Sequence, residues 1–486
     1  MISLRMDELV RAVGGRRLPR DRPSNRSASV TGSLLTDRVA GVSADTRTLK
    51  PGEVFVALEG ENFNGHAFVA EALAKGARAV LVAESATSTL RVDDQHRGDL
   101  ILVDDTRAAL GRLAHHRRSA LGGATKVIAV TGSNGKTTTK GMIDHVLGTC
   151  LPGRAAPKSF NNDVGVPLTL LSAEPSDRYL VVEIGSNAPG EVAYLAAMAA
   201  PDIGVVTSIG HAHLEGFGGI DGVVREKLSL LDHIACGGLG VVNLDDLRRM
   251  DHEPLPDALK TVTFGTDPQA DVRVTALQSR LDGVTFRISD RYQVRLPGPG
   301  VHNATNAAAA FAVARFAFGE QLEPERIAEA LATVRLPNMR LDVRRFDGLT
   351  VVEDCYNANP TSMAAGIEVL RAVRGGRRVL VAGEMMELGT DSAALHERIG
   401  ALAVRSGIDL VVSVGRGAGP VIDGARSVNP AVAALACDTI EQACADVVPL
   451  LAAGDTVLIK GSRAVGLERL TERIVQRFSA MPLKRR

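Results

Sequence analysis

Tryptophan is absent from this chain of 486 residues, and aromatic residues of all kinds make up only 3% of it. There is no excess of charge of either sign, since 56 lysines and arginines balance 56 aspartates and glutamates. Proteins that bind nucleic acid usually present a basic surface, often with aromatic side chains that stack on bases. The composition therefore argues against a nucleic-acid partner.

Cysteine and long apolar runs are scarce as well. The five cysteines are scattered in no spacing typical of a metal or redox site, and one of them must stay unpaired. This use of cysteine fits a reducing compartment. No apolar run is long enough to span a bilayer. We therefore expect a cytoplasmic protein without an integral membrane segment.

The length allows about three domains, and 45% of the residues are hydrophobic, which is enough to fill large cores. Short β-branched runs alternate with amphipathic helical patterns, as is typical of α/β folds with mostly parallel sheets. Leu336–Arg340, which contains a proline, looks like a linker. We predict three α/β domains, at residues 1–110, 111–336 and 337–486. Among the predicted elements are strands at Tyr179–Ile184, Leu239–Asn243 and Thr456–Lys460 and an alanine-rich helix at Thr305–Phe318.

The most informative stretch follows a β-branched run at 127–130 and leads through a turn with two glycines into the apolar spacing of a helix. Strand, glycine turn and helix start describe a cradle for phosphate, in which backbone N–H groups face the anion. Lys136 would reach the outer phosphates, and Thr137 would offer a hydroxyl group to Mg²⁺. Only two residues separate Gly132 from Gly135, fewer than in the common P-loop. The predicted nucleotide site consists of Thr131, Gly132, Ser133, Asn134, Gly135, Lys136, Thr137 and Thr138.

Two later stretches carry candidate metal ligands. Glu183 ends an apolar strand, at the position where α/β folds often place functional groups, and could hold Mg²⁺ opposite Thr137. The alternative is a solvated glutamate at a strand end. His211, His213 and Glu215 also follow a strand, and an imidazole could bind a second divalent ion. Turn residues without a ligand are the alternative there.

Other segments are less specific by themselves. Asn161 and Asn162 could be functional or could cap the next helix, and Lys227 would ordinarily be a solvated lysine on a helix. Asn306 could cap the alanine-rich helix or read an adenine edge. Tyr356, in an unusual loop after a strand, could stack on a base.

Taken together and in this order, these segments resemble the Mur ligase family, whose members form amide bonds with ATP in peptidoglycan precursor synthesis. The shortened phosphate loop, Asn161-Asn162 and His302-Asn303-x-x-Asn306 are family marks. Within the family, the chain is most similar to the ligases that add D-alanyl-D-alanine. The stretches that support this are Ala212–Gly218, Tyr356–Pro360 and Gly383–Gly389, with Asp45–Arg47 and Lys460–Arg463 in agreement.

The resemblance implies one domain for the UDP end of the substrate, one for ATP and a Rossmann-like one that closes over the site. It implies that Lys136 and Arg340 act on the phosphates, and that Lys227 becomes a carbamate that helps to bind metal. The implied ATP contacts are the phosphate loop, Asn306, Arg340 and Tyr356, and the implied metal ligands are Thr137, Glu183, His213 and modified Lys227. The implied contacts with the UDP-linked substrate are Ser43, Thr46, Arg47, Asn161 and Asn162.

The expected function is ligation of D-alanyl-D-alanine to UDP-N-acetylmuramoyl-tripeptide by a monomer that uses ATP and Mg²⁺. The alternatives are another amide ligase of the superfamily, of the tripeptide synthase or folylpolyglutamate synthase type, or a nucleotide-binding regulatory protein that has lost ligation. Two departures from the family pattern are visible. Cys355 stands where serine is common, and Leu228-Ser229 replaces the Gly-Glu that often follows the modified lysine.

Overall fold

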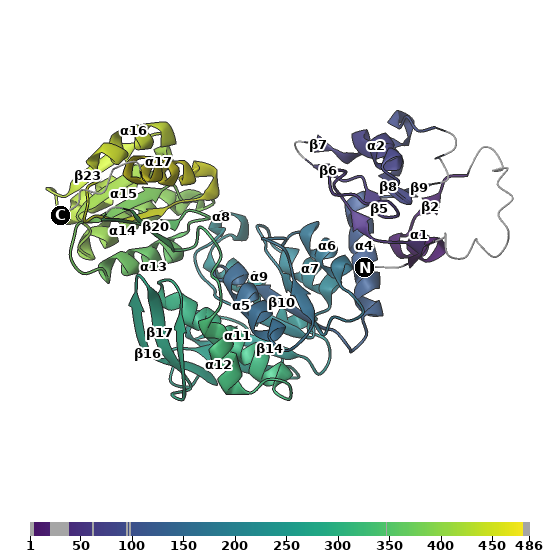
Figure 1. Ribbon diagram of the computed structural model, residues 1–486, viewed down its shortest axis with the longest axis horizontal. Helices are drawn as coiled ribbons and strands as arrows, with labels where there is room; N and C mark the ends of the chain where they lie inside the picture. The colour runs from purple at the N-terminus through teal and green to yellow at the C-terminus, as the bar shows by residue number, and fades with distance from the viewer. Residues whose placement is uncertain are drawn as a thin grey trace.

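The computed structural model describes residues 4–19, 38–60, 63–93, 96, 99–346 and 348–479. The chain forms an N-terminal, a central and a C-terminal part, each an α/β structure with a mostly parallel sheet, and the two outer parts lie on either side of the central one (Figure 1). The predicted α/β architecture is confirmed. In the part of the chain that the structure describes, no helix has the length and apolar character needed to cross a membrane.

The N-terminal part is a small sheet with strand order β2-β9-β8-β5-β4, in which only the β2 edge is antiparallel. Its strands are β2 (Arg16–Arg17), β4 (Val42–Ser43), β5 (Val54–Val56), β8 (Ala79–Ala83) and β9 (Leu100–Val103). Around them lie α1 (Met6–Val13), α2 (Val69–Ala74), the pair β1 (Leu4–Arg5) and β3 (Arg38–Val39), and the pair β6 (Glu59–Gly60) and β7 (Phe63–Asn64).

A long helix, α4 (Thr106–Ala120), follows this sheet and leads into the central part (Figure 1). Asp105 caps it, because its side chain accepts a hydrogen bond from the Ala108 N–H at 2.7 Å. The helix packs against α1 on one side and against two helices of the central part on the other. The predicted boundary between residues 110 and 111 therefore falls inside one continuous helix.

The central sheet has nine strands in the order β11-β12-β10-β13-β14-β15-β16-β17-β18, and only its last two pairs are antiparallel. The strands are β10 (Lys126–Thr131), β11 (Gly153–Ala155), β12 (Tyr179–Glu183), β13 (Ile203–Val206), β14 (Leu239–Asn243), β15 (Lys260–Gly265), β16 (Val272–Arg280), β17 (Gly283–Ile288) and β18 (Tyr292–Leu296). The helices are α5 (Lys136–Gly148), α6 (Gly165–Ser172), α7 (Glu191–Ala199), α8 (Leu214–Phe217), α9 (Ile220–Leu228), α10 (Leu244–Leu247), α11 (Val301–Phe318) and α12 (Pro324–Ala332).

Strand β10 shows why the central strands are apolar without interruption. Ile128 and Val130 are buried in the same core as α5 and α11, whereas Val127 and Ala129 are buried with α6 and α7 on the other face. A strand covered on both faces needs an apolar residue at every position. The predicted strand at 239–243 is confirmed, and β12 ends at Glu183, one residue earlier than predicted.

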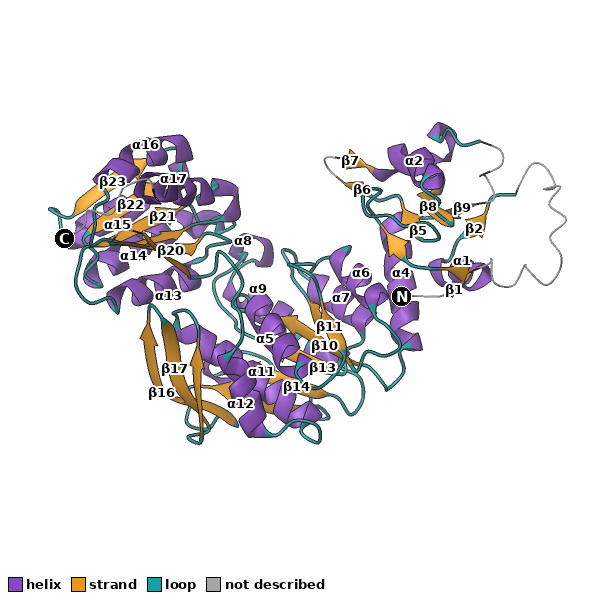
Figure 2. Cartoon of the chain, viewed as in Figure 1, coloured by secondary structure: helices purple, strands orange, loops and turns teal. Residues whose placement is uncertain are grey.

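The C-terminal sheet has the order β19-β20-β24-β21-β22-β23 and is parallel except for the β19 edge. Its strands are β19 (Asp342–Phe346), β20 (Leu349–Asp354), β21 (Arg378–Gly383), β22 (Leu410–Val414), β23 (Ala433–Cys437) and β24 (Thr456–Lys460, as predicted). Helices cover the sheet (Figure 2), namely α13 (Pro360–Arg371), α14 (Ser392–Arg405), α15 (Pro420–Val428), α16 (Ile440–Leu450) and α17 (Glu468–Ser479).

One predicted helix start is wrong. Helix α11 begins at Val301, four residues before the predicted Thr305, so Asn303 and Asn306 lie within the helix and do not cap it. The Asn303 side chain instead donates a hydrogen bond to the Pro299 carbonyl at 2.9 Å. This contact and the packing of the helix in the central core extend it beyond its alanine-rich part.

Candidate active site

The phosphate loop lies between β10 and α5, as predicted. Gly132 has a φ of 141° and Gly135 a φ of 82°, both in a region that favours glycine. A Cβ atom at Gly132 would lie 2.3 Å from the Thr207 hydroxyl oxygen, and one at Gly135 would lie 2.4 Å from the Asn306 side-chain oxygen. The loop thus needs glycine at both positions for conformation and for space.

Lys136 is the first residue of α5. Its ammonium group donates a hydrogen bond to the Gly132 carbonyl at 2.5 Å, across the loop. Burial lowers the pKa of Lys136 to about 8, while Glu183 acts in the opposite direction. A partly buried cation in a glycine loop at a helix N-terminus is suited to bind an anion such as phosphate.

Glu183 lies at the end of β12 with 1% of its surface exposed, so the alternative of a solvated strand-end glutamate is wrong. One carboxylate oxygen, Oε1, accepts hydrogen bonds from the Thr137 hydroxyl and the Asn161 amide, each at 3.1 Å. The other oxygen, Oε2, is paired with the Lys140 ammonium at 2.9 Å. Sequence reasoning did not single out Lys140, although it lies one helical turn after Lys136 in a chain with few lysines.

The donor set around Thr137 fits Mg²⁺. Its hydroxyl group and the Glu183 carboxylate are adjacent oxygen donors, and oxygen is what Mg²⁺ prefers. Within the described ranges, no three His, Cys, Asp or Glu side chains are arranged to hold a metal ion by themselves. Mg²⁺ at nucleotide sites usually takes one or two protein oxygens and completes its shell with water and phosphate.

Lys227 is not the solvated lysine that an isolated reading of its helix suggests. Its surface is 1% exposed, and its ammonium group donates to the Ser186 hydroxyl at 2.5 Å and lies 5.4 Å from the centre of the Phe217 ring. Burial, followed by the nearby charge of Lys136, lowers the pKa of Lys227 to about 7. A large fraction of this amine is therefore neutral near pH 7.

The His213 ring lies near the same Phe217 ring in a T-shaped arrangement, with the ring centres 6.5 Å apart. Burial lowers the pKa of His213, and the carboxylate of Glu387 opposes this effect. Glu387 belongs to the loop after β21 in the C-terminal part and is in ion-pair contact with the His213 Nδ1 atom. His211 is exposed and lies apart from this cluster.

The linker and the C-terminal part bring two predicted residues to the phosphate loop. Arg340 donates a hydrogen bond to the Thr137 hydroxyl at 3.1 Å, and its guanidinium group lies 4.3 Å from the centre of the Tyr356 ring. Tyr356 in turn donates to the Ser159 hydroxyl at 2.7 Å. The guanidinium group is thus held between the phosphate loop and an aromatic ring.

A second contact joins the two parts beside this one. The Asn359 amide donates to the Asn134 side-chain oxygen at 2.9 Å, and the reverse contact measures 3.5 Å. Asn359 also caps α13, since it accepts from the Ser362 N–H at 2.8 Å. Neither Asn359 nor Ser159 was predicted as a site residue.

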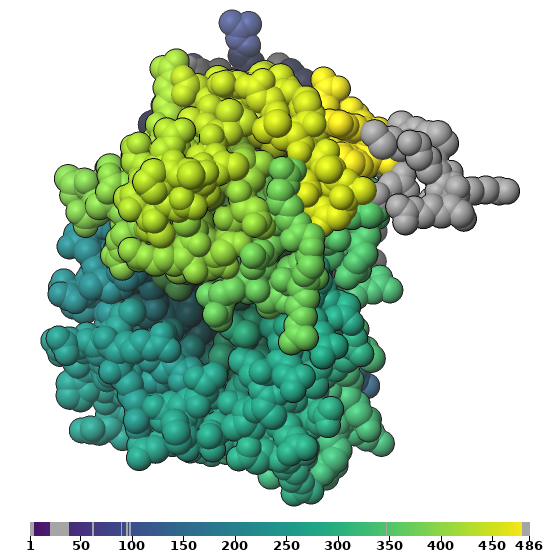
Figure 3. Space-filling view, turned by 90° about the vertical axis from the view of Figure 1, so that its left-hand side faces the viewer, coloured from purple at the N-terminus to yellow at the C-terminus, as the bar shows by residue number. Residues whose placement is uncertain are grey.

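Many of these groups line one cavity of about 850 Å³ between the central and C-terminal parts, namely Ser133 to Thr138 of the phosphate loop, Glu183, His213, Arg340, Tyr356 and Asn359. Lys140, Lys227 and Glu387 are not among its lining residues. Figure 3 shows the C-terminal part, in green to yellow, above the teal central part with a hollow between them. Asn306 and His302 of α11 line the cavity, as do Asp354 and Lys460, an ion pair at 2.7 Å that sequence reasoning missed. Lys460 resembles Lys140 in being one of the few lysines of the chain and buried, although it ends strand β24 and Lys140 lies on a helix.

The residues predicted to contact the UDP-linked substrate lie in two separate places, and only some of them line the cavity. Asn161 and Asn162 line the cavity, and Asn162 also accepts a hydrogen bond from the Gly165 N–H at 2.9 Å, as the capping alternative suggested.

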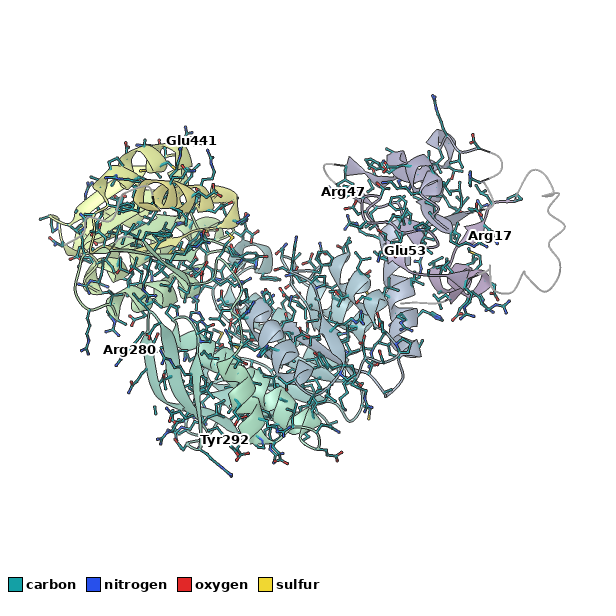
Figure 4. All side chains as sticks on the ribbon, viewed as in Figure 1. Arg17, Arg47, Glu53, Arg280, Tyr292 and Glu441 are labelled. Carbon is teal, nitrogen blue, oxygen red and sulfur yellow. The ribbon has the colours of Figure 1, made fainter. Side chains whose placement is uncertain are left out.

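The N-terminal candidates do not line this cavity. Ser43 bonds locally to the Asp45 backbone, the Thr46 carbonyl accepts from Lys75 at 2.9 Å, and Arg47 pairs with Asp45 at 2.7 Å. The Arg47 side chain is 86% exposed and lies at the edge of the N-terminal part that is turned toward the rest of the molecule (Figure 4).

Three family models match successive parts of the chain. They describe the Mur ligase family catalytic domain over residues 38–118, the Mur ligase middle domain over 130–314 and the Mur ligase glutamate ligase domain over 339–463. The chain therefore belongs to the Mur ligase family, and the expected family is confirmed.

Proteins of similar sequence and structure show which members of the family this chain resembles. The UDP-N-acetylmuramoyl-tripeptide--D-alanyl-D-alanine ligase of Bacillus subtilis is 34% identical over 444 residues, which cover 90% of this chain and 93% of the relative. A crystal structure of MurF from Acinetobacter baumannii superposes with a TM-score of 0.84 at 31% identity and covers 98% of this chain and 99% of its own. The MurF ligase of Thermotoga maritima, solved in complex with ADP, has a TM-score of 0.77 at 28% identity, with 91% and 98% covered.

Proposed function

We propose that this chain joins D-alanyl-D-alanine to UDP-N-acetylmuramoyl-tripeptide at the expense of ATP, in peptidoglycan precursor synthesis. The products are the UDP-linked pentapeptide, ADP and phosphate. The observation that carries the proposal is the meeting of Lys136 and Glu183 with Arg340 and Tyr356 in one cavity. The similarity to ligases named for this reaction over nearly the whole chain supports it.

The residues suit the activation of a carboxylate. A free carboxylate acylates an amine poorly, so its oxygen first attacks the γ-phosphorus of ATP, and ADP leaves. The amine of the dipeptide then attacks the acyl phosphate, passes through a tetrahedral intermediate, loses a proton and expels phosphate. In the first step, Lys136 and Arg340 stabilise the charge that spreads over the phosphoryl oxygens.

The cavity also suits a reaction that must exclude water. An acyl phosphate is readily hydrolysed, and the cavity is closed on one side by Tyr356 and Asn359 of the C-terminal part. The adenine end of ATP lies toward Asn306, beyond the phosphate loop. Thr137 and Glu183 would hold Mg²⁺, which would supply positive charge to the phosphates when it is bound.

Lys227 serves the same site after modification. The neutral amine nitrogen bonds to the carbon of CO₂ and loses a proton, which gives a carbamate anion. The reaction needs a neutral amine, and the burial of Lys227 provides one near pH 7. The carbamate and His213 would then offer donors to a second divalent ion on the side of Phe217.

The remaining roles follow the domain division. Residues 1–110 hold the UDP end through Ser43, Thr46 and Arg47, residues 111–336 hold ATP, and residues 337–486 close over the site. Asn161 and Asn162 face the substrate from the central part. We place the enzyme in the cytoplasm as a monomer, which sedimentation at micromolar concentration would check.

Phosphate release in the presence of ATP, Mg²⁺ and UDP-linked tripeptide tests the proposal. D-Alanyl-D-alanine should stimulate it, whereas diaminopimelate, lysine and glutamate should not. Lys136→Ala should abolish the stimulation, and Lys126→Ala, at an exposed lysine in the preceding strand, should leave it unchanged. Stimulation by diaminopimelate or glutamate in place of the dipeptide would assign the chain to another amide ligase, and no stimulation by any amine would contradict ligation.

A further inference from the structure

An arginine in the first turn of α4 connects the N-terminal part with a loop at the border of the cavity. The Arg107 Nη1 group donates to both carboxylate oxygens of Asp163, at 3.0 Å each, and Nη2 donates to the Glu59 carbonyl at 2.8 Å. Asp163 lines the cavity, and Glu59 is the first residue of β6. One guanidinium group therefore holds a backbone carbonyl of the N-terminal part and a carboxylate of the central part.

The N-terminal end of this bridge lies at one edge of the N-terminal sheet. Strands β4, β5, β8 and β9 are parallel, so their carboxyl ends meet at this edge, where α/β folds commonly bind ligands. The residues proposed to hold the UDP end, Ser43, Thr46 and Arg47, lie at the end of β4 or follow it, and Glu59 follows the neighbouring strand β5. The proposed UDP site and the Arg107 bridge therefore share an edge.

The segment that Arg107 holds is also fixed within the N-terminal part. The Thr106 hydroxyl donates to the Ala57 carbonyl at 3.0 Å, and the Gly65 N–H donates to the Leu58 carbonyl at 2.7 Å. A Cβ atom at Gly65 would lie 2.5 Å from the same Leu58 oxygen, so this close approach needs glycine. The segment leads into the β6 and β7 pair, which lies on the side of the N-terminal part that is turned toward the rest of the molecule (Figure 1).

The other end of the bridge belongs to the loop that carries the predicted substrate contacts of the central part. Asn161 donates to the Glu183 carboxylate at 3.1 Å, and Asp163 is two residues further along the chain. The last turn of α4 is fixed to the central part as well, because Arg118 pairs with Asp202 at 3.0 Å. With α4 fixed there, the contacts of its first turn determine how the edge of the N-terminal sheet lies relative to the cavity.

We propose that Arg107 is a positioning residue for the UDP-linked substrate. It holds the segment that follows β5 against the loop at 161–163, so that the UDP site and the phosphate loop lie at the separation that one substrate molecule spans. Two sites that bind the two ends of one ligand reinforce each other only when their geometry lets both be occupied at once. Arg107 is not among the residues that line the cavity, so it acts through Glu59 and Asp163. The inference rests on the proposed function.

Calorimetric titration of the full-length protein with UDP and with UDP-linked tripeptide separates positioning from direct contact. Arg107→Ala should weaken binding of the UDP-linked tripeptide about fivefold, the effect of a partly exposed ion pair, and leave UDP binding unchanged. Arg112→Ala is the matched control, because Arg112 lies on the same helix, is 38% exposed against 37% for Arg107, and pairs with Asp104 within the N-terminal part. Equal weakening of both ligands, or of neither, would overturn the proposal.

Steady-state kinetics provide a second readout. Arg107→Ala should raise the KM for the UDP-linked tripeptide about fivefold and leave kcat and the KM for ATP unchanged. Asp163→Asn should have a similar effect, and the double variant should be no worse than either single variant, because both substitutions remove the same contact. A loss of kcat without a change in KM, or additive effects in the double variant, would contradict a positioning role.

Hydrogen exchange of the ligand-free protein tests the bridge without a substrate. Peptides that contain Gly65 and His66 should exchange faster in Arg107→Ala than in the parent or in Arg112→Ala. Unchanged exchange in these peptides would overturn the proposal whatever the activity. If the parent showed no ligation of D-alanyl-D-alanine but exchange responded to Arg107 alone, the proposed function would be wrong, whereas the role of Arg107 in holding this edge would stand.

Discussion

Replacing Lys140 by methionine would leave the Glu183 carboxylate without its cation in a buried position. The two charged groups are 2.9 Å apart, and their side chains are only 5% and 1% exposed. At an effective dielectric constant of about 20, their Coulomb attraction is about 6 kcal/mol, much of which offsets the cost of removing both ions from water. Removal of one partner from a buried pair typically costs about 3–5 kcal/mol. We expect Lys140→Met to lower the free energy of unfolding of the central part by this amount.

Tyrosine fluorescence during urea unfolding provides the assay, because the chain has no tryptophan and only four tyrosines. Tyr179, Tyr194 and Tyr292 belong to the central part. The Tyr179 hydroxyl donates to the Asp144 carboxylate at 2.9 Å, and Asp144 lies on the same helix as Lys140. The signal therefore reports on the structure that the substitution disturbs. Measurements in EDTA without nucleotide exclude any effect of a divalent ion.

Two variants separate charge from packing. Lys140→Arg keeps the cation and should lose far less stability than Lys140→Met. The double variant Lys140→Met/Glu183→Gln has no uncompensated charge and should recover most of the loss. Lys126→Met, at an exposed lysine, should change little. If Lys140→Met stayed within about 1 kcal/mol of the parent, the reasoning about a buried ion pair would be refuted, since even exposed pairs reach that value.

Three further substitutions test the loop and the contacts between the parts. Gly135→Ala would place a Cβ atom 2.4 Å from the Asn306 side-chain oxygen, at a backbone φ of 82°. Titration calorimetry should therefore show that nucleotide binds about 10-fold or more weakly. Unchanged binding would mean that the loop does not need glycine at this position. Tyr356→Phe removes the hydrogen bond to Ser159 but keeps the ring beside the Arg340 guanidinium group. The KM for ATP should rise about fivefold, the equivalent of about 1 kcal/mol. A rise above about 100-fold would mean that the Tyr356 hydroxyl has another role. Asn359→Ala removes both the cap of α13 and the amide contact with Asn134 of the phosphate loop. Thermal unfolding should show the C-terminal part less stable by about 1–2 kcal/mol. An unchanged unfolding temperature would mean that neither contact contributes to stability.

Local patterns account for what the sequence predicts well. The phosphate loop is recognisable because a strand, two glycines and a helix start are neighbours in the chain, and each leaves its own mark in residue type. The strands at Leu239–Asn243 and Thr456–Lys460 are found at the predicted residues because strands buried on both faces are apolar throughout. The start of α11 was missed because tertiary packing, which no local pattern reveals, extends that helix to Val301.

Contacts across the molecule account for what the sequence does not show. Arg340 and Thr137 are 203 residues apart in the chain, and Asn134 and Asn359 are 225 apart. Such pairs depend on how two separately folded sheets dock, and no periodicity encodes that. Lys227 is a second example of this limit. Its helix has the pattern of an ordinary amphipathic helix, but its ammonium group contacts Ser186 and the Phe217 ring, which belong to other segments of the chain.

The neutral net charge of the chain does not show how cations are placed near the phosphate loop. Lys227 is buried and Lys136 is partly buried, and the charge of Lys136 is one cause of the lowered pKa of Lys227, while Arg340 contributes to the lowered pKa of Lys136. The carboxylate of Glu183 opposes this repulsion at Lys136. A triphosphate bound at the loop would oppose it further and favour the charged form of Lys136. Because the effect depends on short distances within the site, it is independent of the overall charge of the chain, which argued only against a nucleic-acid partner.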